Sequence, residues 1–156
     1  MKHDVVPVQI RGILPAANGF ALFIGNDEKV FVIQVERAMG EVIAQALRGT
    51  LKDRPLTHDL IGHIFKGFAI QVERAVITDL RNSTYFARLI LKQENELGQK
   101  IVELDARPSD CLAIAAATKR PVFVSRKLFV QVEDMSQLLT QLGEQNSGDD
   151  ETETEG

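Results

Sequence analysis

The sequence contains one cysteine, no tryptophan and no long apolar run. A single cysteine, Cys111, excludes an internal disulfide and a zinc site built from several cysteines. No segment approaches the roughly 18 apolar residues that a membrane helix requires, so we expect no membrane partner. The first residues also lack the apolar stretch of a secretory signal. Together these absences predict a cytoplasmic protein.

Several common enzyme signatures are missing as well. The chain has no Walker loop and no GxGxxG, GxSxG or HExxH motif. These absences argue against the commonest nucleotide-binding, hydrolase and zinc-protease designs. What is present is a globular composition, with 44% hydrophobic and 26% charged residues in a chain of 156. A chain of this length can bury a core without disulfides or metals.

The charge is unevenly distributed along the chain. The net charge is −4, but residues 147–156 carry five acidic side chains and no basic one. The rest of the chain therefore carries −4 + 5 = +1. We predict that 147–156 is a disordered acidic tail. It either keeps the chain in solution or mimics nucleic acid and competes for a basic face.

The residue pattern predicts one domain over 1–132, an amphipathic helix over 133–146 and the tail. Apolar and β-branched runs predict strands, and Pro7 suggests that the first is an edge strand. Helical spacing then follows each group of three strands, which predicts a duplicated β-β-β-α unit. The fold class is α+β, with a mostly antiparallel sheet and helices packed on it. The expected strands are 5–13, 20–24, 30–35, 71–80, 85–92, 101–104 and a short one at 121–124, and the expected helices are 38–47, 57–65 and 109–117.

The densest group of candidate site residues follows the strand at 101–104. Glu103 and Asp105 point to the same side of a strand, and Asp110 lies in the first turn of the next helix. Three carboxylates that converge would suit a divalent cation, Mg²⁺ or Mn²⁺. Arg107 can hold a phosphate in a two-pronged contact. The structural alternative is that Ser109 caps the helix, Asp110 complements the helix dipole, and Arg107 pairs with Asp105 or Asp110.

A second group surrounds the helix that Thr57 is expected to cap. Asp59 and His63 are four residues apart and share a helix face, while His58 lies on another side. Such a pair can bind a metal, or the carboxylate can orient a general base. It can equally be a hydrogen bond on a solvated helix face. Arg54 precedes this helix, as Arg107 precedes the later one.

Arg88 and Cys111 each have a functional and a structural interpretation. Arg88 alternates with apolar neighbours in a predicted strand, so it faces either solvent or a nucleic-acid groove. Cys111 follows Asp110 on an apolar helix, and we interpret it as a small core residue rather than a nucleophile.

The stretch from Leu104 to Ala115, with Asp-Ala-Arg-Pro-Ser-Asp at its centre, resembles the signature of the bifunctional nuclease domain family. The segments 54–60, and 76–80 followed by 85–89, resemble two more of its blocks, and the likeness covers roughly 5–132. It implies a compact α+β domain that is often a homodimer, with RNase and DNase activity in some members. The positions that match its motifs are Arg54, His58, Asp59, Asp105, Arg107, Ser109 and Asp110.

The sequence departs from this family pattern at three places. Glu36 stands where relatives usually have a glycine, Met39 where a glutamate is expected, and Cys111 where alanine is usual. If the first two positions belong to the active surface, the protein is weakly active or inactive.

Two functions follow from these observations. In the first, the protein is a metal-assisted nuclease acting on RNA or DNA. Asp105 and Asp110 bind the cation with support from Glu103, arginines 54 and 107 hold phosphates, and His58 or His63 is the base or acid. In the second, the protein is a non-catalytic dimeric interaction module.

Overall fold

The computed structural model describes residues 4–49 and 53–143, so the predicted tail lies outside the described residues. Within them, seven strands form one sheet in the order β3-β2-β1-β7-β4-β5-β6. The strands are β1 (Val5–Ala16), β2 (Gly19–Gly25), β3 (Val30–Glu36), β4 (Ile70–Arg81), β5 (Thr84–Asn95), β6 (Gly98–Ala106) and β7 (Val122–Ser125). The labelled helices are α1 (Arg37–Arg48), α2 (Thr57–Gly67), α3 (Pro108–Thr118) and α4 (Arg126–Gln131), and a further helix covers 136–143. The predicted α+β class is confirmed.

Two antiparallel meanders, β1-β2-β3 and β4-β5-β6, form the halves of the sheet. Strand β7 joins them, since it pairs antiparallel with β1 and parallel with β4. It confirms the short strand expected at 121–124. The sheet is therefore mixed but mostly antiparallel.

The order β1-β2-β3-α1 and β4-β5-β6-α3 contains the duplicated β-β-β-α unit that the sequence predicts. The dipeptides Arg54-Pro55 and Arg107-Pro108 do not mark equivalent points of the two units. α1 continues directly from β3, as α3 follows β6, so the helix after Arg54-Pro55 is the additional helix α2.

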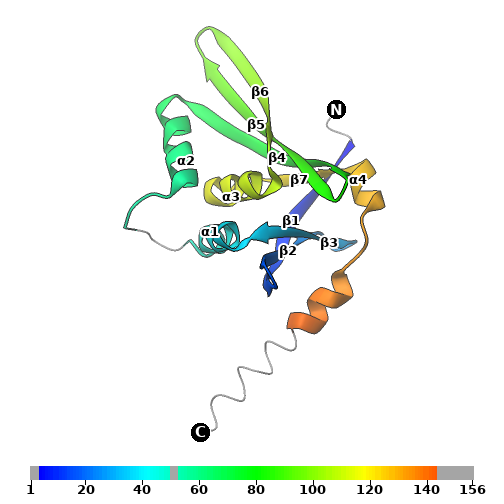
Figure 1. Cartoon of the computed structure of the whole chain (residues 1–156). Coiled ribbons are helices and arrows are strands. Elements are labelled where there is room, and N and C mark those ends of the chain that lie inside the picture. Colours follow the sequence, from blue (N-terminus) through cyan, green and yellow to red (C-terminus); the bar gives the residue numbers. More distant parts are fainter. Residues whose placement is uncertain (1–3, 50–52, 144–156) are drawn as a thin grey trace.

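Helix α3 lies at the centre of the molecule, between α1 and α2 (Figure 1). Leu112 and Ala113 belong to the core cluster of β1, β2 and β3, whereas Ile114 and Ala115 belong to the cluster of β4 and β5. Cys111 is fully buried in this second cluster, which confirms its reading as a core residue. A helix that is covered on several sides needs apolar residues around its whole circumference. This explains the run of small and aliphatic residues from 111 to 115.

A close approach brings α1 onto β2. A Cβ atom added at Gly40 would lie 2.3 Å from Phe20 Cδ2 and 2.9 Å from Phe20 Cβ. Only glycine leaves room for the aromatic ring at this point of the helix. The contact fixes the position of Met39 and Val42, which lie on the same helix and line the site described below.

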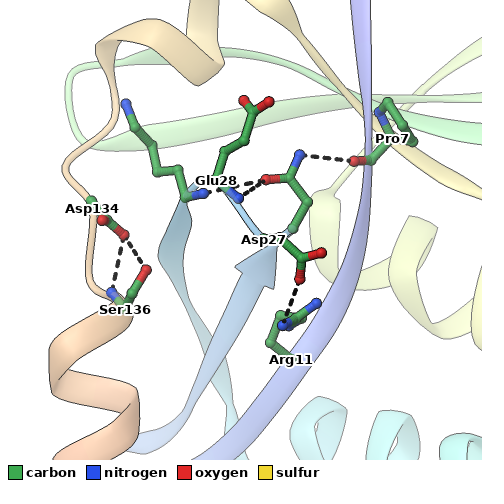
Figure 2. Close-up of polar contacts among 8 residues, drawn as sticks. Pro7, Arg11, Asp27, Glu28, Asp134 and Ser136 are labelled. Carbon is green, nitrogen blue, oxygen red and sulfur yellow. Dashed lines mark hydrogen bonds and ion pairs between the residues drawn. The ribbon is translucent and has the colours of Figure 1, made fainter.

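The expectation that Pro7 marks an edge strand is wrong, because β1 lies in the interior of the sheet. At Pro7, β1 pairs with β7, and its pairing with β2 begins only at Gln9. The carbonyl oxygen of Pro7 instead accepts a hydrogen bond from Asn26 Nδ2 at 3.3 Å (Figure 2). Proline is tolerated because the missing N–H falls on the side where the β2 ladder has ended.

Polar contacts from the turn between β2 and β3 anchor the C-terminal segment. Lys29 Nζ donates to the carbonyl oxygens of Phe129 and Val132, each at 2.9 Å, and to that of Val130 at 3.4 Å. The Asp134 carboxylate accepts a hydrogen bond from the N–H of Val30. It also accepts hydrogen bonds from Ser136 (Figure 2). The helix over 136–143, within the predicted 133–146, is thereby tied to the start of β3. No helix in the described ranges is long and apolar enough to cross a membrane.

Candidate functional site

A groove of about 630 Å³ opens between α2, α3 and the strands β5 and β6. Its walls are mostly apolar side chains from five elements and from Leu56, which precedes α2. They are Met39, Val42, Leu56, Ile61, Phe65, Leu89, Leu104, Ala106, Ala113 and Ile114. Its polar lining residues are Thr57, His58, Asp105, Arg107 and Asp110, all of which the sequence singled out. The two motif blocks, about fifty positions apart in the chain, therefore meet at one groove.

The N-termini of α2 and α3 both border this groove, but their caps differ from the prediction. Ser109 and Thr57 were expected to cap these helices, and both expectations are wrong. α3 has Arg107 at its N-cap and Pro108 inside the first turn, with no side-chain cap. The ring of Pro108 fixes the φ that the first helical residue needs, so the helix starts before Ser109.

At α2 the N-cap is Leu56, so Thr57 is already the first helical residue. The Asp59 carboxylate reaches back and accepts a hydrogen bond from the Leu56 N–H at 2.8 Å. The N–H of the N-cap residue lies outside the hydrogen-bond ladder of the helix. The acid at the third helical position satisfies it, which is one half of a capping box.

Arg107 and Asp110 form a two-pronged ion pair at the groove mouth. Arg107 Nε donates to Asp110 Oδ2 at 2.9 Å, and Nη2 donates to Oδ1 at 3.2 Å. The hydrogen bond from Asp110 raises the pKa of Arg107 above its ordinary value, so the guanidinium stays charged. This contact confirms the alternative in which Arg107 pairs with Asp110. Because a guanidinium has five N–H donors, three still point elsewhere.

His58 is a buried polar side chain on the opposite wall, with 8% of its surface exposed. Its Nε2 atom lies 3.2 Å from Oδ1 of Asp59, its neighbour in the chain. A carboxylate at this distance fixes the orientation of the imidazole ring. The pair is thus held at the groove with a defined geometry.

Glu103 and Asp105 emerge on a different face from Asp110. Leu89 and Leu104 are cross-strand partners and both line the groove, so alternation directs their neighbours to the other side of the sheet. Arg88, the cross-strand partner of Asp105, is exposed on that other side. The structure therefore places Arg88, Glu103 and Asp105 together there, with Asp105 also bordering the groove at the end of β6.

The carboxylates do not fit a resident cation as they stand. Among the residues that the structure describes, no group of three His, Cys, Asp or Glu side chains is placed to hold a metal ion. We therefore assign no chemical step to an ion. The Mg²⁺ or Mn²⁺ that the sequence suggested stays a prediction.

A second recess, of about 360 Å³, lies on the other side of α2. Arg54, Asp59 and His63 line it together with residues at the end of α1. Asp59 and His63 therefore share a helix face, and His58 lies on another, as their spacing predicts. Asp59 therefore connects the two sites, since it lines this recess and also contacts His58, which lines the groove.

Two of the three departures from the family pattern, Met39 and Glu36, lie beside the groove. Met39 forms part of its apolar wall. Glu36 is the N-cap of α1 and is close enough to Arg107 to help raise its pKa. Cys111, the third departure, is buried below the motif. Burial first, and then Asp110 and Asp105, raise the pKa of its thiol to about 12, so it is not a nucleophile at neutral pH.

The sequence alone did not reveal the apolar walls of the site. Ile61 and Phe65 follow the spacing of an ordinary buried helix face, and Leu104 alternates with acidic residues as a core-facing strand residue does. In the structure Leu104 stays 41% exposed, which distinguishes it from a core residue, but nothing in its spacing shows this. Apolar residues that surround a cavity have the same periodicity as those that fill a core.

Comparisons with known proteins identify the family of the chain. The model of the family described as "Bifunctional nuclease domain" matches residues 22–136. An uncharacterized protein of Mycobacterium tuberculosis is 29% identical over 106 residues, which cover 68% of this chain and 60% of that protein. Bifunctional nuclease 1 of rice, Oryza sativa, is 31% identical over 107 residues, covering 67% of this chain and 31% of the relative. The chain thus spans less than two thirds of these relatives.

Proposed function

Because the chain belongs to the bifunctional nuclease domain family, we propose that it cleaves phosphodiester bonds of RNA or DNA at the mouth of the apolar groove. One observation carries this proposal. The segments around Arg54-Pro55 and Arg107-Pro108 place a buried histidine and a charged arginine on the same groove. Nucleic acid is the proposed partner, and the cytoplasm stays the predicted location.

Arg107 would hold the phosphate. Two of its N–H groups are engaged by Asp110, which fixes the guanidinium plane and leaves the other donors for a phosphate oxygen. The free N–H groups at the start of α3 add positive potential beside it. Binding a phosphate here needs no rearrangement of the ion pair.

His58 would move the proton. The attack of water on phosphorus requires a base, and the departing oxygen requires an acid. An imidazole that Asp59 orients can do either, and burial in an apolar wall shields it from bulk water. Asp59 acts here as a positioning residue.

The groove itself suits a nucleobase. Its apolar wall consists of aliphatic side chains together with Met39 and the ring of Phe65. A base enters such a site only when it is unstacked, so single-stranded substrates are favoured over duplexes. This gives the proposal a substrate preference that can be measured.

An alternative function also has support. Leu60, Ile64 and Phe68 form a stripe with a four-residue repeat along α2 and are 52%, 48% and 67% exposed. Apolar stripes of this kind typically contact another protein. In this alternative the protein is a non-catalytic interaction module that forms a homodimer through α2.

The test is cleavage of labelled single-stranded RNA and DNA in the presence of Mg²⁺, Mn²⁺ or chelator. We compare the wild type with Arg107→Gln and Asp110→Asn. The matched control is Asp79→Asn, because Arg81 and Asp79 form an ion pair at the same 2.9 Å with similar exposure, outside the groove lining. We expect both groove variants to lose about tenfold or more of the activity, as for removal of a phosphate or positioning contact.

The outcomes separate the two functions. Equal cleavage by the wild type and the groove variants would place the activity elsewhere or in a contaminant. Absence of cleavage by a folded wild type would favour the interaction module, and Phe68→Asp should then disrupt a dimer in sedimentation experiments. A gain of activity in Met39→Glu would show that the departure at Met39 weakens catalysis.

A further inference from the structure

Another concave surface lies at the other end of α3, away from the groove. It encloses about 840 Å³ between the last turns of α1 and α3 and the strands β1 and β2. Three cationic side chains line it, Arg11, Lys119 and Arg120, and one acidic side chain, Asp27. A concave surface with an excess of one charge attracts ligands of the opposite charge.

The cations of this surface are available to a ligand. Lys119 and Arg120 are exposed, and among the described residues neither is within ion-pair distance of a carboxylate. Arg120 makes a 3.4 Å hydrogen bond to the carbonyl oxygen of Glu73, which leaves its charge uncompensated. Arg11 contacts Asp27 at 3.4 Å, but Asp27 is 97% exposed, so the pair is weak (Figure 2).

The basic surface continues toward the candidate site. Ala46 lines both this surface and the recess that contains Arg54, His63 and Asp59. A strand that lies on Lys119 and Arg120 would therefore pass the end of α1, reach Arg54 and arrive at α2. Opposing charges along this path come from Asp27, Asp59 and the neighbouring Asp53, so the cationic excess is greatest at the α3 end.

We propose that the surface of Arg11, Lys119 and Arg120 binds the sugar-phosphate backbone of a single-stranded nucleic acid whose cleaved phosphate lies at Arg107. This inference rests on the proposed function for the direction of the strand, but the binding surface itself does not require cleavage. α3 has 11 residues and is about 16 Å long. A stacked strand covers about 3.4 Å per nucleotide and an extended strand covers more, so the straight distance between the two ends corresponds to at most about five nucleotides.

The experiment measures binding of labelled single-stranded RNA and DNA by fluorescence anisotropy as a function of salt. The variant is Lys119→Glu with Arg120→Glu, and Lys119→Gln with Arg120→Gln is a milder second variant. The control is Lys100→Glu with Lys127→Glu, which changes two exposed lysines outside this surface by the same charge. Thermal unfolding confirms that all variants are folded.

The salt dependence distinguishes phosphate contacts from a structural role. Lys119 and Arg120 also complement the carbonyl end of α3, so their loss can lower stability. Helix stability does not change the number of counterions released on binding. The slope of log K against log salt is negative, and each lost phosphate contact reduces its magnitude by about 0.7 for a single strand. We expect the magnitude of the slope to fall by about 1.4 in both variants. We also expect the affinity at 50 mM salt to fall about tenfold or more.

The length of the oligonucleotide gives a second readout. We expect affinity and cleavage to rise between about three and eight nucleotides in the wild type, and this rise to disappear in the variants. Unchanged slopes in the variants would overturn the proposal while leaving cleavage at Arg107 untouched. Binding that needs Lys119 and Arg120 in a protein that does not cleave would support the surface and refute the nuclease. A wild type that binds neither nucleic acid would overturn the surface.

Discussion

Replacing Gly40 by alanine should destabilise the protein, although alanine favours helices. The added Cβ would lie 2.3 Å from Cδ2 and 2.7 Å from Cγ of Phe20. Rotation of the ring can relieve these contacts, but not the one at 2.9 Å to Phe20 Cβ, which is fixed to the backbone of β2. Either α1 or β2 must shift, and a shift of α1 would move Met39 and Val42 in the groove wall.

The magnitude follows from two opposing effects. Extra methyl groups in a packed site cost about 1–3 kcal/mol. Alanine in place of glycine in a helix gains up to about 1 kcal/mol. Contacts as short as 2.3 Å lie in the upper part of the first range, at about 2–3 kcal/mol, so we expect a net loss of about 1–2 kcal/mol in the free energy of unfolding. For a domain of this size that corresponds to a decrease in Tm of roughly 2–8 °C.

Gly62 provides the matched control. It lies inside α2, and a Cβ added there meets nothing within 4 Å. Gly62→Ala should therefore stabilise the protein by about 0.5–1 kcal/mol. Urea unfolding of the two variants beside the wild type should give shifts of opposite sign.

Equal shifts in the two variants would refute the close packing of α1 on β2. A double-mutant cycle adds a second check. In a Phe20→Ala background the clash partner is shortened, so Gly40→Ala should cost about 1 kcal/mol less than in the wild type. If Gly40→Ala is equally costly in both backgrounds, the strain does not come from the Phe20 ring.

Three further predictions concern the core and the C-terminal segment. Burial raises the pKa of the Cys111 thiol to about 12, so thiol reagents at pH 8 should modify it only in unfolded protein, and rapid modification of the native protein would contradict this. Lys29→Met removes the donor to three carbonyl oxygens and should cost about 1–3 kcal/mol, with faster amide exchange over 133–143 as the observable. Hydrogen bonds from Ser136 and then from the Val30 N–H hold the pKa of Asp134 below its ordinary value. The stabilisation from Asp134 is therefore present above about pH 4 and lost as the pH falls further, so the wild type and Asp134→Asn should converge in acid; a constant difference in stability would contradict the assignment.

The sequence predicts the fold well wherever the pattern is local. Alternating and continuous apolar runs located β1 to β7, and helical spacing located α1, α2 and α3. Helix α4 was missed, because its six residues are too few to show a period. The position of Pro7 was misjudged because the end of the β2 ladder is a property of the assembled sheet.

The site was predicted in part for a similar reason. Motif spacing identified His58, Arg107 and Asp110, which do line one groove. The sequence left the partner of Arg107 open between Asp105 and Asp110. Only the three-dimensional placement of β6 relative to α3 shows that the partner is Asp110. The predicted convergence of Glu103 with Asp110 depended on the face of β6 to which Glu103 points. The groove lies on the opposite face, the one to which Leu104 points.

Strand β7 has a consequence for how this chain is made. Val5 pairs with Ser125 and Ala75 pairs with Val122, so both meanders wait for the same late segment. At roughly 5–20 residues per second, the first meander leaves the ribosome several seconds before its partner strand exists. During that interval β1 keeps an open edge that can pair with another nascent chain. A stop codon or stall before Val122 would yield two unjoined three-stranded sheets, a product that should depend strongly on chaperones.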